Sequence, residues 1–296
     1  MSSRAKAYLA LTVMAIIWGA AFPIIKPALN LVSPLQFLYF RYLIAAPLLL
    51  PFFFYYLFRL KPALKTFLSI MAIEFIGTPL SLPILYQGLK LTSALEASLI
   101  GAAGPVFTII GGIIFLKEKE EKREWKGLGL SFLGTLILVV EPLITGRNSH
   151  AGFSFQGNLL IILSSLINTA YLLLAKKNYR QLPKVFVSSI NYPVALGSLW
   201  LMLKIGQLSA SPGLLAIPAV TLASGYMAIF GSIIAFTLLL YGQSRIEASE
   251  ASLFTYLQGI VAIPAAWVIL NEVPTWPMAG AIILITGGVI LAEKRV

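Results

Sequence analysis

Long, uninterrupted apolar runs recur along this chain of 296 residues, and they constrain its fold more than any other feature. Several exceed the length of about 18 residues at which an apolar segment is read as a membrane span. Only 11% of the residues are charged, whereas a soluble domain carries about 25%. Because lipid offers the backbone no hydrogen-bond partner, spanning segments are helices or closed barrels. The runs are continuous rather than alternating, so we predict an all-α membrane protein.

The apolar runs divide into ten predicted transmembrane helices, since about 20 helical residues cross a hydrocarbon layer of about 30 Å. The connecting segments are short, so we expect no separate soluble domain. The predicted spans are residues 8–28, 34–58, 66–88, 94–116, 125–145, 156–175, 184–206, 216–242, 247–270 and 276–292.

Lys and Arg are distributed very unevenly among the segments that connect these spans. If the N-terminus is cytoplasmic, 17 of the 22 Lys and Arg fall on the cytoplasmic side and three on the outer side. Short cytoplasmic loops carry such an excess. We therefore predict an integral protein of a prokaryotic cytoplasmic (inner) membrane with both termini in the cytoplasm. Topology then explains the net charge of +11. The expected partners are lipid and a small-molecule substrate but no nucleic acid, and the protein is expected to be a monomer or homodimer.

The chain repeats itself after about half its length. Residues 94–118 and 248–272 align with eight of 25 positions identical, and the last aligned pair is Glu118 and Glu272. A repeat of this length indicates a duplicated domain rather than a solenoid. Each copy holds five spans, an odd number, so the second copy enters the membrane from the opposite side. Inverted repeats of this kind place a binding site near the membrane midplane.

Several short motifs occur in a characteristic order: Trp18 through Pro23, Ser33-Pro34, Phe40-Arg41-Tyr42, Pro105-Val106-Phe107 and Trp125-Lys126-Gly127. Together they resemble the EamA branch of the drug/metabolite transporter superfamily, over essentially the whole chain. The resemblance implies ten helices in two inverted repeats, residues 1–146 and 147–296. It also implies a secondary transporter of small organic metabolites, often an exporter of amino acids or related compounds. The ninth predicted span lacks the basic pair of relatives that move sugar phosphates, which counts against a phosphorylated substrate.

Two ionisable residues lie at depth in predicted spans, where such residues usually face the bundle interior and mark functional sites. Arg41 is interpreted either as a hydrogen-bonding centre that stabilises the fold or as a ligand for a substrate carboxylate. Glu74 could relay protons as the coupling group or bind an amine. The alternative is a neutral carboxyl that is hydrogen-bonded to a neighbour or paired with Arg41. Lys26, at the outer end of the first span, is expected to snorkel to the membrane surface.

Acidic residues begin and end the repeated spans. Glu96 and Glu250 open spans four and nine, where a carboxylate complements the helix dipole. Glu118 and Glu272 close the same spans, so we expect compensating donors there, in a surface contact or a clamp between the repeats. With Trp18, these four acids are the candidates for a gate or repeat interface.

Gly and Pro interrupt predicted spans three, four, eight and nine, which correspond to one another under the repeat. Interrupted helices at matching places in two repeats point to a transport cavity, although close packing through small residues is an alternative. The expected helix breaks are Pro79, Pro83, Gly104, Pro105, Gly259 and Pro264.

Aromatic and amide side chains in the same and neighbouring spans suit a cavity for a moderately apolar molecule with a polar handle. Tyr86 lies near a span end, so an interfacial aromatic belt explains it as well. Asn191 and Tyr192 add the seventh span. With Arg41 and Glu74, the candidate substrate-binding residues are Tyr86, Asn168, Tyr171, Tyr226, Tyr256 and Gln258.

Composition bears on the remaining classes of function. The sequence has no Cys and a single His, and all 11 acidic residues are Glu. Aspartyl chemistry and Cys or His metal clusters are therefore not expected, and neither is a catalytic residue, a metal or a cofactor. We predict an alternating-access carrier without enzymatic activity that exports amino acids or related amphipathic compounds, with proton coupling through Glu74 as a hypothesis. The alternatives are an intramembrane enzyme, a channel or receptor, and uptake of a nucleotide-sugar or another metabolite.

Overall fold

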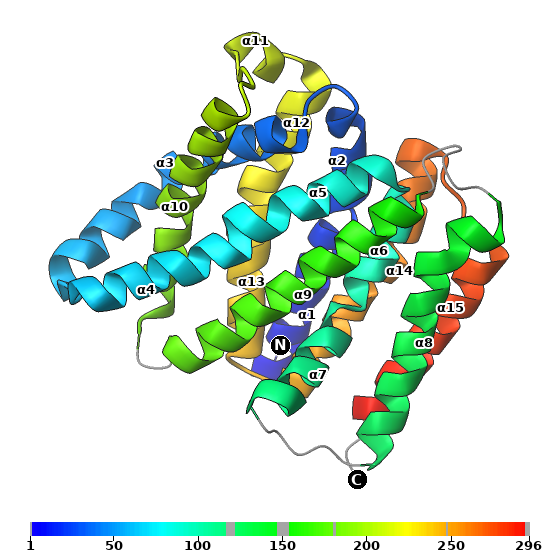
Figure 1. Ribbon diagram of the computed structural model, residues 1–296. Helices are drawn as coiled ribbons and strands as arrows, with labels where there is room; N and C mark the ends of the chain where they lie inside the picture. The colour runs from blue at the N-terminus through cyan, green and yellow to red at the C-terminus, as the bar shows by residue number, and fades with distance from the viewer. Residues whose placement is uncertain (1, 117–121, 147–153, 180–181, 247, 294–296) are drawn as a thin grey trace.

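The computed structural model describes residues 2–116, 122–146, 154–179, 182–246 and 248–293, and this part of the chain is helical without strands (Figure 1). The elements, where η marks a π-helix, are α1 Ser3–Gly19, α2 Ala21–Leu29, α3 Pro34–Leu60, α4 Leu64–Phe75, η1 Ile76–Leu80, α5 Ser81–Leu91, α6 Ala94–Ala102, α7 Gly104–Leu116, α8 Lys122–Ile144, α9 Phe155–Asn178, α10 Lys184–Ile205, α11 Pro212–Leu215, α12 Pro218–Tyr226, η2 Met227–Ile234, α13 Ala235–Gln243, α14 Ala248–Leu270 and α15 Trp276–Glu293.

The prediction of an all-α membrane protein is confirmed. Within the described residues, eight helical segments are long and apolar enough to cross a membrane. They correspond to the first eight predicted spans. The last two predicted spans contain shorter apolar stretches, Leu257–Leu270 and Trp276–Gly288.

Apolar side chains cover much of the outside of the bundle, as expected for a protein in lipid. In the most apolar window of Pro34–Leu60, only 17% of the residues are buried. Phe52, Phe54 and Phe58 are all exposed there. The charged side chain of Arg41, on the same helix, is buried instead. This outer surface is therefore suited to contact with the hydrocarbon layer of a membrane.

Hydroxyl side chains begin several helices. Ser33 forms a capping box with Gln36, in which each side chain binds the other residue's backbone N–H, and Pro34 occupies the first helical position of α3. Ser93 caps α6 and Ser154 caps α9 in the same way, by accepting a backbone N–H from the first turn. Such caps satisfy donors that have no partner within the helix.

Two membrane segments contain a π-helix, in which backbone hydrogen bonds span five residues instead of four. η1 separates α4 from α5, and η2 separates α12 from α13. The repeat aligns residues 94–118 with 248–272, a shift of 154 positions; the same shift moves η1 onto residues 230–234, which lie within η2. Single π-helical turns often lie at functional sites.

Pro79 lies inside η1, and Pro83 follows in the first turn of α5. Gly104 and Pro105 begin α7, directly after the turn at Ala103 that separates it from α6. The third and fourth membrane segments are therefore irregular in the region where the sequence predicted breaks.

The ninth segment behaves differently, because α14 is continuous through Gly259 and Pro264. The prediction of helix breaks at these two positions is wrong. A β-carbon on Gly259 would lie 3.2 Å from the β-carbon of Ala102, so this glycine serves the close approach of α14 to α6. A single Pro is tolerated within a membrane helix because neighbouring groups and local adjustments satisfy the freed carbonyl.

The contacts between the two halves come in matching pairs. α8 packs along α15, and α3 packs along α10. α5 packs along α9, and its counterpart α13 packs along α1. α9 also packs against α6 and α7, just as α1 and α2 pack against α14. The pattern of packing is thus retained when the helices of one half are exchanged for those of the other.

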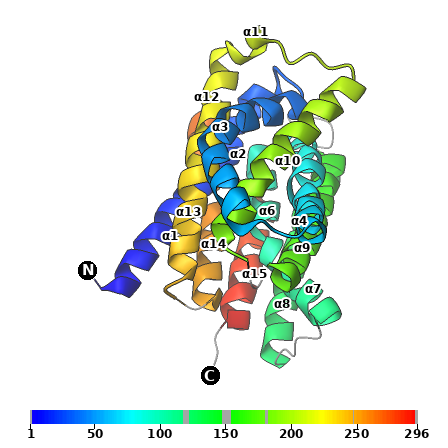
Figure 2. The same ribbon diagram turned by 90° about the vertical axis from the view of Figure 1, so that its left-hand side faces the viewer.

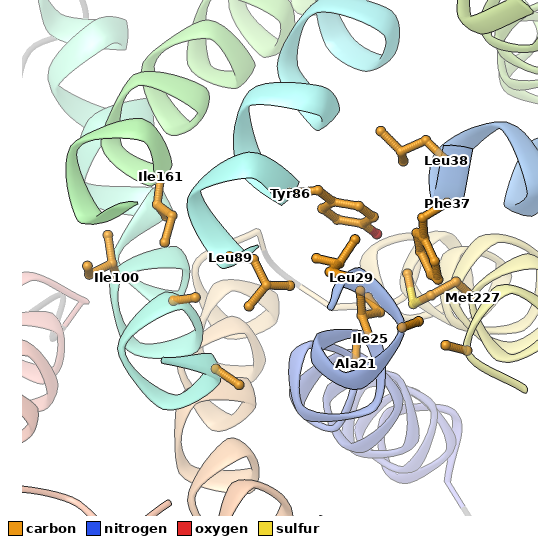
Figure 3. Close-up of a cluster of buried hydrophobic side chains, with 14 of the residues drawn as sticks. Ala21, Ile25, Leu29, Phe37, Leu38, Tyr86, Leu89, Ile100, Ile161 and Met227 are labelled. Atoms are coloured by element: carbon orange, nitrogen blue, oxygen red, sulfur yellow. The ribbon is translucent and has the colours of Figure 1, made fainter. Parts of the chain in front are cut away.

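The start of α1 and the end of α15 lie toward one end of the bundle, opposite α11 (Figure 2). We call the end that carries α11 and the α5–α6 and α14–α15 connections the far end. The largest apolar core joins helices from both halves. Figure 3 shows Tyr86 of α5 reaching toward Leu29 of α2 and Phe37 of α3. The rings of Phe37 and Tyr86 are 5.6 Å apart.

Candidate functional site

A buried arginine on α3 is held by neutral groups among the described residues. Arg41 is 9% exposed. Its Nη1 donates to the Tyr86 hydroxyl at 3.0 Å, and its Nε and Nη2 donate to Ser232 Oγ at 3.2 and 3.0 Å. The guanidinium carbon also lies 5.3 Å from the centre of the Tyr42 ring, which is a cation–π distance. These partners fix the guanidinium but supply no negative charge.

The serine that binds Arg41 is itself held on two sides. Ser232 lies in η2, where its hydroxyl donates to the backbone oxygen of Met227 at 2.8 Å. Its own backbone oxygen accepts a hydrogen bond from Tyr192 Oη at 3.3 Å. The Tyr192 ring in turn lies 5.9 Å from that of Tyr42. The π-helical turn therefore holds the Ser232 hydroxyl in place as an acceptor for the Arg41 guanidinium.

A buried carboxyl lies in the last turn of α4, two residues before η1. Glu74 is 1% exposed. Its Oε1 accepts hydrogen bonds from Tyr179 at 2.9 Å and Tyr171 at 3.3 Å, and its Oε2 accepts one from Asn191 Nδ2 at 2.7 Å. Asn191 also donates to Thr78 Oγ1 at 2.7 Å. Burial raises the pKa of the Tyr179 phenol, and Glu74 raises it further, so this phenol remains a donor.

The two buried ionisable groups share α10 as a common support. Asn191 binds Glu74, and the next residue, Tyr192, binds the backbone of Ser232, which holds Arg41. The residues come from α3, α4, η1, α5, α9, α10 and η2, and hence from both halves of the chain. We call this set the polar cluster: Arg41, Tyr42, Glu74, Thr78, Tyr86, Tyr171, Tyr179, Asn191, Tyr192 and Ser232.

A glycine in η1 allows Tyr171 to approach Glu74. A β-carbon on Gly77 would lie 2.6 Å from the Tyr171 ring, a distance that real contacts do not reach. Any larger residue at this position must displace the ring. The absence of a side chain at Gly77 is therefore part of the geometry around Glu74.

The polar cluster combines a fixed cation, a carboxyl and several phenols, without a direct bond between the two ionisable groups. Such a set can recognise a molecule that carries a carboxylate and an amine, because Arg forms strong paired hydrogen bonds with carboxylates. No group of three or more His, Cys, Asp or Glu that could hold a metal occurs among the described residues.

The structure places the other predicted substrate-binding residues elsewhere. Tyr226 donates to the backbone oxygen of Ile17 at 2.6 Å, and Gln258 contacts the sulfur of Met14 at 3.6 Å, so both face α1. Asn168 is exposed on α9. The side chain of Tyr256 lies outside the described part of the chain.

Trp18 and Glu272 both make contacts between the halves. Trp18 Nε1 donates to the backbone oxygen of Gly231 in η2 at 2.9 Å. The Glu272 carboxylate accepts the backbone N–H groups of Ala94 at 3.2 Å and Leu95 at 2.9 Å. Glu272 thus caps α6 of the other half.

Glu96 is fully buried on α6. Its backbone N–H donates to Ser93 Oγ, and its side chain accepts a hydrogen bond from Asn158 of α9, in the second half. Glu118 and the side chain of Glu250 lie outside the described residues.

Lys26 does not reach the membrane surface, so the expectation that it snorkels is wrong. It is 8% exposed. Its ammonium donates to the backbone oxygens of Leu89 at 2.7 Å, Lys90 at 3.0 Å and Thr92. An ammonium has three hydrogens, and all three are used to close the C-terminus of α5.

Sequence reasoning missed Ser232, Tyr179, Glu141 and Asn158. Glu141 and Asn158 are both fully buried, and each contacts residues distant in the sequence. Ser232 follows a glycine in a predicted span, which was a weak signal of an irregular helix. Nothing in the sequence pairs Tyr179 with Glu74, because their contact depends on how α9 packs against α4.

Comparisons with known proteins agree on one class. The family model described as the EamA-like transporter family matches residues 5–140 and again residues 155–293. An uncharacterized transporter of Archaeoglobus fulgidus is 26% identical over 296 residues, covering 100% of this chain and 99% of the relative. The uncharacterized transporter YdfC of Bacillus subtilis is 27% identical, covering 95% of this chain and 88% of the relative.

Two further comparisons extend this result. The uncharacterized inner membrane transporter YedA of Escherichia coli is 27% identical, covering 86% of this chain and 79% of the relative. A solved crystal structure of another protein superposes with a TM-score of 0.64 at 17% identity, covering 98% of this chain and 96% of that chain. At this identity the likeness concerns the fold alone.

Proposed function

Because this chain belongs to the EamA-like transporter family, we propose that it is a secondary carrier that moves small organic metabolites by alternating access. Two inverted repeats, residues 1–146 and 147–296, would form the moving halves. The twofold family match, the paired contacts between the halves and the corresponding positions of η1 and η2 support this arrangement. Carriers of this design bind substrate between their repeats.

The polar cluster is the proposed substrate site, because its residues come from both halves. The observation that carries the proposal is Arg41, a buried cation whose hydrogen bonds all go to neutral hydroxyls. Burying a charge without a counter-charge is costly, and a substrate carboxylate would remove that cost. Glu74, in the same cluster, would receive an amine. We therefore propose amino acids or related amphipathic compounds as the substrates.

The orientation is proposed from the charge distribution, and the direction of transport from the resemblance to a family whose members are often exporters. The excess of Lys and Arg near the chain ends places both termini in the cytoplasm, and the membrane would be a prokaryotic inner membrane. Export is the proposed direction. All residues of the polar cluster come from one chain, so the site is complete in a monomer.

Competing classes make different measurable predictions. An intramembrane enzyme would form a product, and a channel would never accumulate substrate against a gradient. The relatives are named as transporters, which favours a carrier over both. Uptake of a nucleotide-sugar fits the polar cluster less well, because Arg41 is the only cation in it.

Counterflow into proteoliposomes tests the substrate class. The competitors are an amino acid, its methyl ester, which lacks the carboxylate, and its N-acetyl derivative, which lacks the amine. We expect the wild type to prefer the free amino acid over both derivatives. Arg41→Gln should lose the preference over the ester, whereas Glu74→Gln should lose the preference over the N-acetyl derivative.

Arg59 is a matched control, because it is an exposed arginine on the same helix, α3. Arg59→Gln should retain both preferences. If Arg41→Gln still discriminates the acid from its ester, Arg41 does not bind the substrate carboxylate. An unchanged pH dependence of transport in Glu74→Gln would exclude Glu74 as the proton-coupling group.

A further inference from the structure

Two further buried carboxyl groups lie apart from the polar cluster, at the far end of the bundle. Glu96 of α6 and Glu141 of α8 are both 0% exposed. The two side chains meet around Asn158, whose Nδ2 donates to Glu96 Oε1 at 3.2 Å and to the backbone oxygen of Leu138, one turn before Glu141 on α8, at 3.1 Å. They are close enough to interact directly. Two carboxylates at this distance would repel each other strongly in a buried site.

The hydrogen bonds of this pair are incomplete. Glu96 accepts from Thr92 Oγ1 at 2.6 Å, from Ser93 Oγ at 3.4 Å and from Asn158 Nδ2 at 3.2 Å. Glu141 Oε1 accepts from Thr275 Oγ1 at 2.9 Å.

Two buried oxygens of these residues have no donor within the part of the chain that the structure describes. Glu141 Oε2 and Asn158 Oδ1 are buried and have no hydrogen-bond partner. A buried acceptor without a donor costs about 1–3 kcal/mol, so native structures rarely retain one. The site therefore has more buried acceptors than donors, so an additional hydrogen there would find an acceptor.

The charges around the pair indicate how much positive charge is missing. The ammonium of Lys26, on α2, is attracted to Glu272 and Glu96, and its three hydrogens go to the carbonyl oxygens that end α5. Lys90 of α5 lies beside Lys26. Glu272, after α14, is matched by the backbone N–H groups that begin α6. Against the three carboxylates Glu96, Glu141 and Glu272, the two ammonium groups of Lys26 and Lys90 leave one unit of negative charge.

We propose that Glu96 and Glu141 share one proton while the far end is closed, and that this proton is the coupling ion of the carrier. The inference rests on the carrier function proposed above. The proton is bonded to one carboxyl oxygen and is donated to the other carboxylate. It gives one of the two unpartnered oxygens, Glu141 Oε2, a hydrogen-bond partner and removes the excess charge.

The position of the pair explains how the proton could be linked to movement. Glu96 and Glu141 belong to the first half, whereas Asn158 and Thr275, which bind them, belong to the second. Separation of the halves at the far end would withdraw both partners and admit water. The proton would then leave to water, and its return would favour closure. This role differs from that of Glu74, which lies on α4 within the polar cluster.

Infrared spectroscopy of the purified protein tests for the proton without any substrate. A protonated carboxyl group has a C=O band that shifts in D₂O. The Glu74→Gln variant serves as the background, because Glu74 is itself a buried carboxyl. We expect the band at neutral pH in this background, and its loss when either Glu141→Gln or Glu96→Gln is added. Glu272→Gln, whose carboxylate binds backbone N–H groups, should leave the band unchanged.

The outcomes separate this inference from the carrier proposal. Absence of the band in the Glu74→Gln background, or its persistence in both double variants, overturns the shared proton whatever the protein transports. Glu96→Gln decides the matter if Glu141→Gln does not fold. A melting temperature that rises with NaCl but not with choline chloride, and only when Glu141 is present, would assign the site to sodium and overturn the inference.

A transport measurement then tests the coupling. In proteoliposomes, an imposed pH gradient should drive accumulation by the wild type and not by Glu141→Gln, while counterflow without a gradient continues in both. Accumulation by Glu141→Gln equal to that of the wild type would overturn coupling through this pair. A protein without any counterflow would contradict the carrier function, and the infrared result would stand independently.

Discussion

Replacement of Glu272 should destabilise the protein by an amount that follows from the hydrogen bonds at the start of α6. The first N–H groups of a helix have no partner within it. Here Glu272 accepts those of Ala94 and Leu95, and Ser93 Oγ accepts that of Glu96. The cap is complete, and two of its three bonds come from the opposite half of the chain.

The magnitude depends on how well water can replace the carboxylate. Ala94 and Leu95 are 0% and 1% exposed, so their N–H groups are poorly hydrated when Glu272 is removed. Each unsatisfied buried donor costs about 1–3 kcal/mol, and the lost charge at the helix N-terminus adds about 0.3–1 kcal/mol. Glu272 itself is half-buried, which admits some water. We therefore expect Glu272→Ala to cost about 2–4 kcal/mol and Glu272→Gln, which keeps one acceptor oxygen, about half of that.

Thermal unfolding in detergent, followed by tryptophan fluorescence, measures the difference. For a chain of this size, 1 kcal/mol corresponds to roughly 2–4 °C in melting temperature. The apparent melting temperature should fall in the order wild type, Glu272→Gln, Glu272→Ala. Asn30→Ala, a change at an exposed polar residue, serves as the control and should stay within about 0.5 kcal/mol of the wild type. A Glu272→Ala variant as stable as this control would refute the capping role.

Further variants test other contacts. Gly77→Ala should fold but lose most transport activity, because its β-carbon would displace Tyr171 from Glu74; Gly225→Ala, with open space around it, is the matched control, and equal activity of the two would contradict this role. Lys26→Met should lower the melting temperature, since three carbonyl oxygens at the end of α5 lose their donor at about 1–3 kcal/mol for each unsatisfied buried group. An unchanged melting temperature of Lys26→Met would show that water satisfies these oxygens.

The class of fold follows from the sequence because lipid imposes a simple rule. Continuous apolar runs of the right length become helices whatever their neighbours are, so the first eight spans could be located without tertiary information. The start of α3 depends on local sequence alone, because Ser33 and Gln36 form their capping box within a single turn. The meaning of Pro264 was not readable, because local sequence does not reveal whether surrounding helices can support a continuous α14.

The candidate site was only partly predictable. The depth of Arg41 and Glu74 in apolar runs marked them as unusual, since lipid penalises isolated charges. Their partners depend on packing between helices that are distant in the sequence, as in the contact of Tyr179 with Glu74. Lys26 was misread for a related reason: its position near a span end suggested the membrane surface, whereas the end of α5 lies beside it in space.

The opposite orientation of the two halves is the central claim, and accessibility of introduced cysteines tests it most directly. The protein has no Cys, so each introduced thiol is the only one. Ala63 lies between α3 and α4, and Ser209 lies at the corresponding place between α10 and α11; both are exposed. With a membrane-impermeant maleimide, we expect Ala63→Cys to be labelled only from the cytoplasmic side and Ser209→Cys only from the outer side. Labelling of both from the same side would contradict the inverted arrangement and, with it, the proposed mechanism of alternating access.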